Sequence, residues 1–161
     1  TGKVSALCPV IIDGQSLVAS ASDDGTVRLW DPVTGQQLRN LEAHRGGVRA
    51  MCPVSVGWRT LLASAGGDRT VRLWDPVTGQ QRRTLEGHTG EVYAVCAVSV
   101  DGDTLLASAG GDRTVRLWDP TTGQCRLVIP VHHEGLALCW LPGNLLVVGL
   151  WAGLLTISLP G

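Results

Sequence analysis

The sequence predicts an all-β fold in which one four-stranded sheet is repeated along the chain, and three observations support this. The hexapeptide Thr-Val-Arg-Leu-Trp-Asp starts at Thr26, Thr70 and Thr114, so the copies follow one another at intervals of 44 residues. Residues 60–76 and 104–120 are identical. Between the hexapeptides, short runs of strand-forming residues alternate with turns rich in Gly, Pro and Asp. A period of about 40 to 45 residues that closes on Trp-Asp is typical of the blades of a β-propeller.

Each period is expected to contain four short strands joined by tight turns. The turn between the third and fourth strands has the sequence Asp-Pro-Val-Thr-Gly in two copies and Asp-Pro-Thr-Thr-Gly in the third. Its Pro presets φ, and its Gly supplies a positive φ. The expected first strands are 4–10, 48–56, 92–100 and 136–141, and the second strands are 16–22, 61–65, 105–109 and 145–150. The third strands are the three hexapeptides and 156–159, and the fourth strands are 37–41, 81–85 and 125–129. Each period therefore predicts an antiparallel meander.

Beyond the Trp-Asp pair, the repeats share two further features. Ala43-His44 and Gly87-His88 precede the first strands, and an Asp stands in a tight turn just before each Thr-Val-Arg-Leu run. With these features the chain resembles the WD40 repeat family along nearly its whole length. The resemblance implies four propeller blades, expected at residues 1–43, 44–87, 88–131 and 132–161, of which the last is degenerate and lacks its outer strand.

The resemblance also implies a buried hydrogen-bond network in each blade, which joins the loop before the first strand to the second and third strands. In the second repeat its members are His44, Ser64, Asp68 and Trp74. The matching residues are His88, Ser108, Asp112 and Trp118 in the third repeat, and Ser20, Asp24 and Trp30 in the first, which has no matching His. A network of this kind satisfies all of its buried polar members at once.

The same Ser, His and Asp could be mistaken for a hydrolase triad. Such a triad needs an exposed Ser beside its base and an oxyanion hole. Here the residues recur in repeat after repeat on strands that are expected to be packed. We therefore expect no catalytic residue, no enzymatic activity and no cofactor.

The fourth repeat departs from the pattern. His132 keeps the register, but Val131 replaces the Gly and Pro160 stands at the Trp position, so no network is expected there. Residues 135–161 carry no charge, and an uncharged run of this length raises a membrane segment as an alternative. Because residues 142–144 (Pro-Gly-Asn) interrupt the run, we favour a terminal blade whose apolar surface is covered by an interface.

The ends of the chain bear on how the ring closes. Thr1-Gly2 align with Thr89-Gly90, so we expect the natural protein to have further blades upstream. Blades of a seven-membered ring each turn through about 51°, so four blades leave the ring open. Two copies arranged head to tail would give eight blades at about 45° each. We therefore expect a homodimer that forms one eight-bladed ring.

Four of the five cysteines also recur with the repeat, at Cys8, Cys52, Cys96 and Cys139. A metal site or a disulfide would require their sulfurs to converge around a central channel. The alternative is that they are small apolar fillers, as buried Cys usually is. Cys125 lies off this register and is expected to be an ordinary strand residue.

Composition limits the classes of partner and the location. A net charge of −1, with 44% hydrophobic and 17% charged residues, excludes disorder and gives no electrostatic reason to expect nucleic acid. The N-terminus lacks the pattern of a secretory signal, so a cytoplasmic location is expected. The bias towards Arg over Lys and the absence of Phe suggest a GC-rich bacterial genome.

The second and third repeats differ mainly in the loop before the first strand. In WD40 proteins this loop and the turn between the second and third strands line the rim around the central channel, where peptides commonly dock. The residues expected to bind a partner are Arg45, Arg49, Arg69, Glu91, Tyr93 and Arg113. Arg and Tyr are frequent interface anchors, and the cations would suit an acidic peptide. Solvated loop variation is the alternative.

Two functions follow from the resemblance. The first is a non-catalytic scaffold that binds other proteins through the rim around the central channel. The alternative is a C-terminal sensing or regulatory fragment of a larger bacterial signalling protein.

Overall fold

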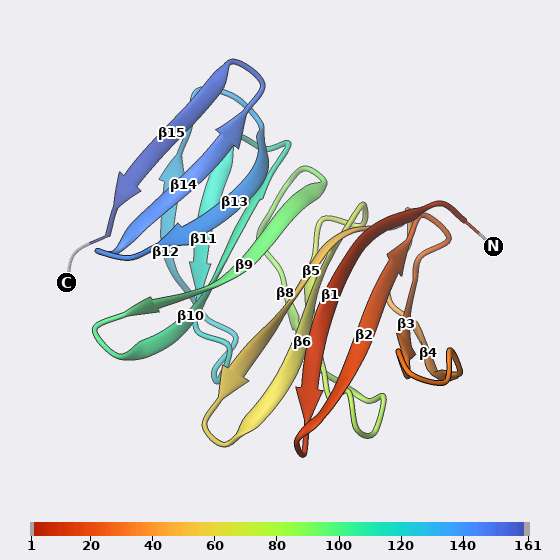
Figure 1. The fold of residues 1–161 in the computed structure, drawn as a ribbon. Helices are drawn as coiled ribbons and strands as arrows, with labels where there is room; N and C mark the ends of the chain where they lie inside the picture. Colours follow the sequence, from red (N-terminus) through yellow and green to blue (C-terminus); the bar gives the residue numbers. More distant parts are fainter. Residues whose placement is uncertain (1, 160–161) are drawn as a thin grey trace.

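The computed structural model describes residues 2–159, which form four antiparallel β-sheets numbered here in chain order (Figure 1). Sheet 1 contains β1 (Val4–Ile12), β2 (Gln15–Ser22), β3 (Thr26–Trp30) and β4 (Gln37–Glu42). Sheet 2 contains β5 (Val48–Val56), β6 (Arg59–Gly66), β7 (Val71–Trp74) and β8 (Gln81–Leu85). Sheet 3 contains β9 (Val92–Val100), β10 (Asp103–Gly110), β11 (Thr114–Trp118) and β12 (Cys125–Pro130). Sheet 4 contains β13 (Gly135–Leu141), β14 (Leu145–Leu150) and β15 (Gly153–Ser158).

In every sheet the strands lie side by side in sequence order, so each sheet is a meander. Together the sheets form a half-propeller, and the prediction of an all-β fold built from repeated meanders is confirmed. Across residues 2–159 there is no helix that could cross a membrane. The uncharged run that raised this alternative is divided among the strands β13, β14 and β15.

The predicted start of the last strand was wrong. We expected it at residue 156, but β15 begins at Gly153, which pairs directly with Leu150. In sheets 1 to 3 the corresponding turn is organised around an Asp carboxylate, which accepts backbone N–H bonds. Sheet 4 has no Asp at that place, and a turn of two residues, Trp151 and Ala152, lets the strand start earlier.

The turns between the third and fourth strands are held by one aspartate each. In sheet 2 the Asp75 carboxylate accepts the backbone N–H groups of Val77 at 3.0 Å and Thr78 at 3.1 Å. The backbone N–H of Gly79 bonds to the Asp75 carbonyl, at a left-handed φ of 76° that favours glycine. The Asp-Pro-x-Thr-Gly pattern therefore forms the hairpin for which its residue types are suited.

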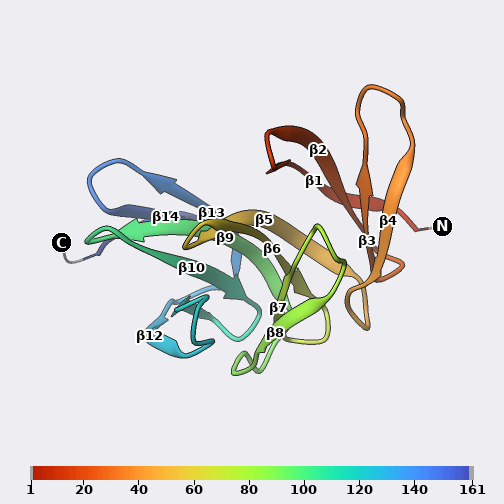
Figure 2. The same ribbon diagram turned by 90° about the horizontal axis from the view of Figure 1, so that it is seen from below.

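The sheets pack face to face around an arc, with their first strands β1, β5, β9 and β13 as successive neighbours (Figure 2). Alternation along the strands gives each sheet two different apolar faces. One face of sheet 2 contributes Met51, Leu62 and Trp74 to a core shared with sheet 1. Its other face contributes Ala63 and Leu73 to a core shared with sheet 3. Each junction thus joins a face that carries a Trp to a face of smaller apolar residues.

At one end of the arc the Trp-bearing face of sheet 1 has no neighbouring sheet. Leu7 on this face is 66% exposed, whereas the equivalent Met51 and Val95 in sheets 2 and 3 are each 7% exposed. Val4 is 53% exposed, although its equivalent Val48 is completely buried. The same positions are therefore buried wherever a preceding sheet is present.

At the other end the far face of sheet 4 is also uncovered. Leu154 is 80% exposed, whereas its equivalents Val71 and Val115 are completely buried. Cys139 is exposed on this face, while Cys8 is buried at the equivalent place in sheet 1. The chain thus carries one free face of each type, at opposite ends of the arc.

The cysteines in repeat register lie on neighbouring first strands and are not joined by disulfides. Cys8 belongs to the core between sheets 1 and 2, and Cys52 and Cys96 pack against the next two cores. Burial raises the pKa of Cys8 to about 11 and that of Cys96 to about 12, which keeps both thiols protonated. No group of side chains in residues 2–159 is arranged to hold a metal ion.

Candidate functional site

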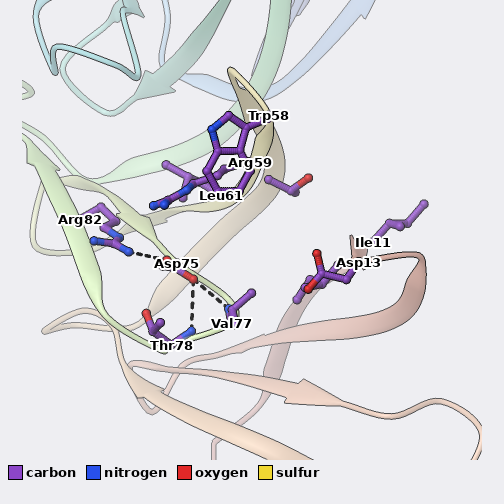
Figure 3. Close-up of a pocket in the computed structure, with 11 residues that line it drawn as sticks. Ile11, Asp13, Trp58, Arg59, Leu61, Asp75, Val77, Thr78 and Arg82 are labelled. Atoms are coloured by element: carbon purple, nitrogen blue, oxygen red, sulfur yellow. Dashed lines mark hydrogen bonds and ion pairs between the residues drawn. The ribbon is translucent and has the colours of Figure 1, made fainter.

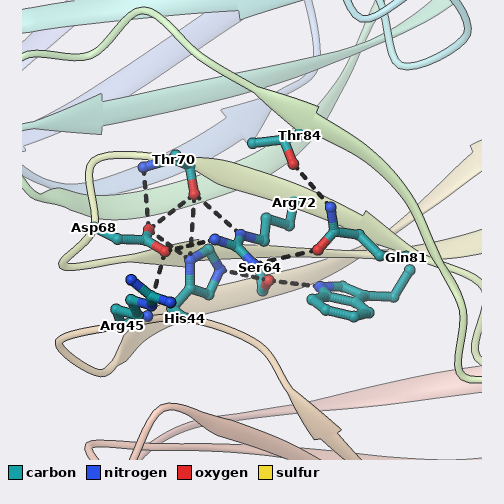
Figure 4. Close-up of polar contacts among 9 residues, drawn as sticks. His44, Arg45, Ser64, Asp68, Thr70, Arg72, Gln81 and Thr84 are labelled. Atoms are coloured by element: carbon teal, nitrogen blue, oxygen red, sulfur yellow. Dashed lines mark hydrogen bonds and ion pairs between the residues drawn. The ribbon is translucent and has the colours of Figure 1, made fainter.

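In sheet 2 a chain of hydrogen bonds connects His44, Ser64, Asp68 and Trp74 (Figure 4). Trp74 Nε1–H donates to Ser64 Oγ at 2.9 Å, and Ser64 Oγ lies 2.7 Å from His44 Nε2. The other ring nitrogen, His44 Nδ1, lies 2.8 Å from an Asp68 oxygen. An indole can only donate and a carboxylate can only accept. The order of protons is therefore set: Ser64 donates to Nε2, and Nδ1–H donates to Asp68.

Burial makes this network sensitive to charge. The His44 side chain is completely buried, and that of Asp68 is 14% exposed. Burial lowers the pKa of His44 despite the nearby carboxylate, so the ring is neutral at pH 7. Burial alone would raise the pKa of Asp68, but hydrogen bonds from His44 and Thr70 and the charge of Arg72 outweigh it and lower that pKa. A neutral imidazole and an ionised carboxylate match the proton order set by the bonds.

Sheet 3 repeats the arrangement. His88 Nε2 lies 2.7 Å from Ser108 Oγ, and Trp118 Nε1–H donates to the same oxygen at 2.8 Å. His88 Nδ1 lies 2.9 Å from Asp112, and burial again lowers the pKa of the histidine. The identical strand sequences therefore build the same network twice.

Sheet 1 contains only part of this network. Trp30 Nε1–H donates to Ser20 Oγ at 2.8 Å, as in the other sheets. Asp24 accepts from the Thr26 hydroxyl at 2.6 Å and from the backbone N–H of Gly2 at 3.2 Å. Ser20 and Trp30 are therefore bonded to each other as in the other sheets, but no histidine ring lies between Ser20 and Asp24.

Sequence reasoning missed one regular member of the network, the threonine that opens each hexapeptide. Thr70 Oγ1 donates to Asp68 at 2.8 Å, and Thr114 makes the same bond to Asp112 at 2.8 Å. The signal was present, because Thr stands two residues after the aspartate in all three copies. From the sequence we expected this threonine only as a strand residue.

An arginine from the same hexapeptide adopts two different arrangements. Arg72 donates to Asp68 at 2.9 Å and to Gln81 at 3.2 Å. Arg116 stands at the same place in sheet 3 but lies over the Trp118 ring, 5.9 Å from its centroid. The fourth strand explains the difference, because Cys125 occupies the position of Gln81 and offers no amide oxygen.

The network cannot work as a hydrolase triad. Ser64 and Ser108 are completely buried, so a substrate carbonyl cannot approach either hydroxyl. Each hydroxyl oxygen also accepts a bond from an indole. The arrangement can hold the second and third strands of a sheet, the turn between them and the preceding loop in register, which is a structural role.

Of the residues expected to bind a partner, Arg49 and Glu91 are paired with each other. The Arg49 guanidinium lies 3.1 Å from Glu91 and 3.2 Å from Asp23. It therefore links the β2–β3 turn of sheet 1 to the loop before sheet 3. The side chain of Arg49 is 33% exposed, so these pairs contribute little stability but do occupy the cation.

The other rim cations are not paired in this way. Arg45, Arg69 and Arg113 are exposed, and the structure gives their side chains no carboxylate partner within residues 2–159. Arg69 and Arg113 stand at left-handed φ values of 67° and 58° in the turns between the second and third strands. Tyr93 lies beside the backbone of the sheet 3 turn at Gly111.

His132 and its neighbour His133 are exposed in the loop before sheet 4. The absence of a network in sheet 4 was expected partly because Pro160, which lies outside the described residues, was placed at the Trp position. This placement was wrong, because Ile157 pairs with Leu146 as Trp118 pairs with Leu106, so Ile157 stands at the Trp position. The backbone of the loop nevertheless follows the repeat, since Val131 N–H bonds to the Arg113 carbonyl at 2.9 Å as Ala43 N–H bonds to Gly25 at 2.8 Å.

The sequence model of the WD40 family, described as WD domain, G-beta repeat, matches residues 1–31, 35–75 and 79–119. The chain belongs to this family. The three matches each end on the Trp-Asp pair of a hexapeptide, and the degenerate fourth blade lies beyond them. The family resemblance predicted from the sequence is confirmed.

Two solved structures place the chain within propellers. The WD40 β-propeller domain of Doa1 is 26% identical, with a TM-score of 0.81, and the match covers 96% of this chain and 50% of that one. The computationally designed Ika4 protein is 29% identical, with a TM-score of 0.80, and the match covers 99% of this chain and 93% of that one. The chain thus spans about half the length of the Doa1 chain and nearly the whole Ika4 chain. WD40 propellers of this kind generally serve as scaffolds for protein interactions.

Lowering the pH from about 7.5 to 5.5 is expected to destabilise the fold. The pKa values of His44 and His88 lie below the ordinary value, so the unfolded chain takes up protons near pH 6.5 that the folded chain does not. Stability therefore falls as the pH drops through this value, by up to about 1.4 kcal/mol per pH unit for each histidine. Urea unfolding at several pH values measures this.

The control for this experiment replaces the exposed His132 and His133 with Gln. This variant should keep the pH dependence of the parent chain. A urea midpoint that does not change between pH 7.5 and 5.5 would contradict the neutral state of the buried rings.

Proposed function

We propose that this chain is a non-catalytic scaffold that binds acidic peptide segments on the rim around the central channel. The observation that carries the proposal is the set of exposed, uncommitted cations Arg45, Arg69 and Arg113. The neighbouring carboxylates Asp68 and Asp112 are engaged in the buried networks. The free charge of this rim is therefore mainly positive.

The proposal assigns different roles to the six rim residues. Arg69 and Arg113 supply charge to the peptide, together with Arg45. Tyr93 supplies an aromatic surface, which is common at peptide interfaces. Arg49 and Glu91 hold the loops in position through their ion pair and contribute no free charge.

Replacing both Arg69 and Arg113 with Gly is expected to weaken the binding of an acidic peptide about three- to tenfold, because two exposed charges are lost. Glycine accepts the left-handed φ at both positions, so the turns should be retained. The measurement is fluorescence anisotropy with a labelled decapeptide that contains four Glu, at low and high salt.

The matched control replaces Arg39 and Arg83 with Ala. These arginines are exposed on the outer strands β4 and β8, so the change in net charge is the same at a distance from the rim. Equal weakening by both variants would mean that only overall charge is being detected, and the rim site would be rejected.

We also propose that two copies close one eight-bladed ring. The two free end faces support this, because one is of the Trp-bearing type and the other of the small apolar type that meet at every internal junction. Burying such faces is favourable by about 25 cal/mol per Å² of apolar surface. A head-to-tail pair on a two-fold axis would cover both faces of both copies.

A second candidate is a sensing or regulatory half-propeller in a longer bacterial signalling protein. It is favoured by the match to Doa1, of which the chain covers 50%. The two candidates differ in what covers the end faces, either a second copy or further blades of the same chain. The oligomeric state of the 161-residue chain distinguishes them.

A further inference from the structure

Two equivalent grooves lie at the end of the sheets opposite to the rim. One wall of each groove is the turn between the first and second strands of one sheet. The other wall belongs to the next sheet and contains two turns, one between its first and second strands and one between its third and fourth strands. Groove A, between sheets 1 and 2, has a volume of about 360 Å³, and groove B, between sheets 2 and 3, has one of about 380 Å³. Both contain an Asp–Arg ion pair of 2.6 Å, Asp75–Arg82 in groove A and Asp119–Arg126 in groove B.

The remaining lining residues of the two grooves differ at six equivalent positions. Groove A has Trp58 and Arg59 where groove B has Gly102 and Asp103. The other differences are Ile11 for Ser55, Ile12 for Val56, Val77 for Thr121 and Asp13 for Gly57. Five of these six positions carry a larger apolar or a cationic side chain in groove A, and the sixth, Asp13, adds a negative charge on the facing wall.

Three apolar side chains of groove A, all of them drawn in Figure 3, are exposed to the solvent. Trp58 is 85% exposed, Ile11 61% and Val77 50%. Exposed apolar side chains that gather around a hollow are typical of a binding surface, whereas single ones are ordinary. The groove is also large enough for a ligand, since binding pockets commonly measure about 300 to 1,000 Å³.

Arg59 is held in place without a carboxylate partner. Its guanidinium carbon lies 4.4 Å from the centroid of the Trp58 ring, a cation–π arrangement. Within residues 2–159 the structure gives it no ion pair. Asp13 lies on the facing wall, in the turn from sheet 1, and is likewise without an ion-pair partner there. The two walls therefore carry opposite charges.

We infer that groove A binds a peptide segment in which large aliphatic side chains are followed by acidic ones. The aliphatic side chains fill the space between Ile11, Val77 and the Trp58 ring. The acidic side chains reach Arg59, and Asp13 on the facing wall repels them and so fixes the direction of the peptide. Exposed Trp and Arg are the residue types that most often dominate binding energy at interfaces.

The experiment measures fluorescence anisotropy with three labelled octapeptides, in which Leu-Leu is followed by Glu-Glu, Ser-Ser or Lys-Lys between Ser-Gly ends. The Glu-Glu peptide is expected to bind best. A variant with Gly57→Asp, Trp58→Gly and Arg59→Asp takes the turn of groove B, which already folds in the same chain. It should weaken binding of the Glu-Glu peptide about tenfold or more.

The reverse exchange tests for gain of binding. The changes Ser55→Ile, Asp101→Gly, Gly102→Trp, Asp103→Arg and Thr121→Val give groove B the apolar side chains and the arginine of groove A. Gly57, which stands in the place of Asp13, is kept because it belongs to the turn that carries Trp58. Calorimetry should then give two binding sites per chain in place of one. The rim variant with Gly at positions 69 and 113 should bind this peptide as the parent chain does, so failure of the rim proposal and failure of this one are distinguishable. No preference for the Glu-Glu peptide, or unchanged binding in the groove A variant, would overturn the inference.

Discussion

Replacing Leu7 with Asp is expected to turn a dimer of this chain into a monomer. Leu7 is 66% exposed on the free face of sheet 1, at a position that is buried in sheets 2 and 3. In a closed ring the new carboxylate would be buried against a face without any charged residue, since residues 135–161 carry none. An unpaired buried charge costs several kcal/mol, and association should weaken at least about 100-fold.

Sedimentation velocity at micromolar concentration measures this change. Val33→Asp is the matched control, because Val33 is 91% exposed in the β3–β4 turn of the same sheet, away from the free face. This variant should remain a dimer. A monomeric parent chain under the same conditions would remove the proposal of a two-copy ring.

The head-to-tail arrangement also predicts that the free face of sheet 4 is part of the interface. Leu154→Asp should dissociate the ring as strongly as Leu7→Asp, because each junction uses one face of each type. If sheet 1 instead paired with the sheet 1 of a second copy, Leu154→Asp would remain dimeric. The two variants together therefore decide how the copies are oriented.

A cross-link gives the register of the junction. Cys8 and Met51 belong to the core between sheets 1 and 2, so the equivalent pair in a closed ring is Cys139 with Leu7 of the second copy. Leu7→Cys should form a disulfide-linked dimer with Cys139 on mild oxidation. The same variant with Cys139→Ser should not form it.

Most of the fold could be predicted because the repeat multiplies each local signal. One Asp-Pro-Val-Thr-Gly turn is weak evidence, but three copies in the same place fix the strands on either side. The second strands β6 and β10 begin two residues earlier than expected, and the largest error in a strand start lies where the repeat itself is lost, at β15. In sheets 1 to 3 the turn between the second and third strands contains an aspartate, which sheet 4 lacks. The three other copies therefore do not indicate how long this turn is without the aspartate.

The candidate sites were less predictable than the strands. The ion pairs of Arg49 join residues from three different sheets, so they depend on how the sheets rotate around the arc. Trp58 drew no notice in the sequence, because its significance comes from Ile11 and Val77, which are far from it along the chain. Side chains brought together by the stacking of sheets cannot be inferred from the period of one sheet.

Gly66→Ala is expected to destabilise the fold by about 3 kcal/mol, although the change adds a single methyl group. A Cβ at this position would stand 2.4 Å from His44 Cγ and 2.5 Å from Nδ1, so the ring would have to move. Moving the ring breaks its bonds to Ser64 and Asp68 and leaves buried polar groups unpaired, at about 1 to 3 kcal/mol for each. The midpoint of urea unfolding measures the loss.

A double-mutant cycle tests whether the loss comes from the clash with His44 or from the backbone at Gly66 itself. The three atoms nearest to the methyl group all belong to the His44 side chain, and one of them is its Cβ. His44→Gly with Gly66→Ala should therefore be about as stable as His44→Gly alone. The control is Ser22→Ala, since Ser22 stands at the same place in sheet 1, carries a Cβ and faces no histidine. It should cost at most about 1 kcal/mol, for one bond to the Asp24 N–H. Fully additive losses in the cycle would show that Gly66 is required for a reason other than the His44 side chain.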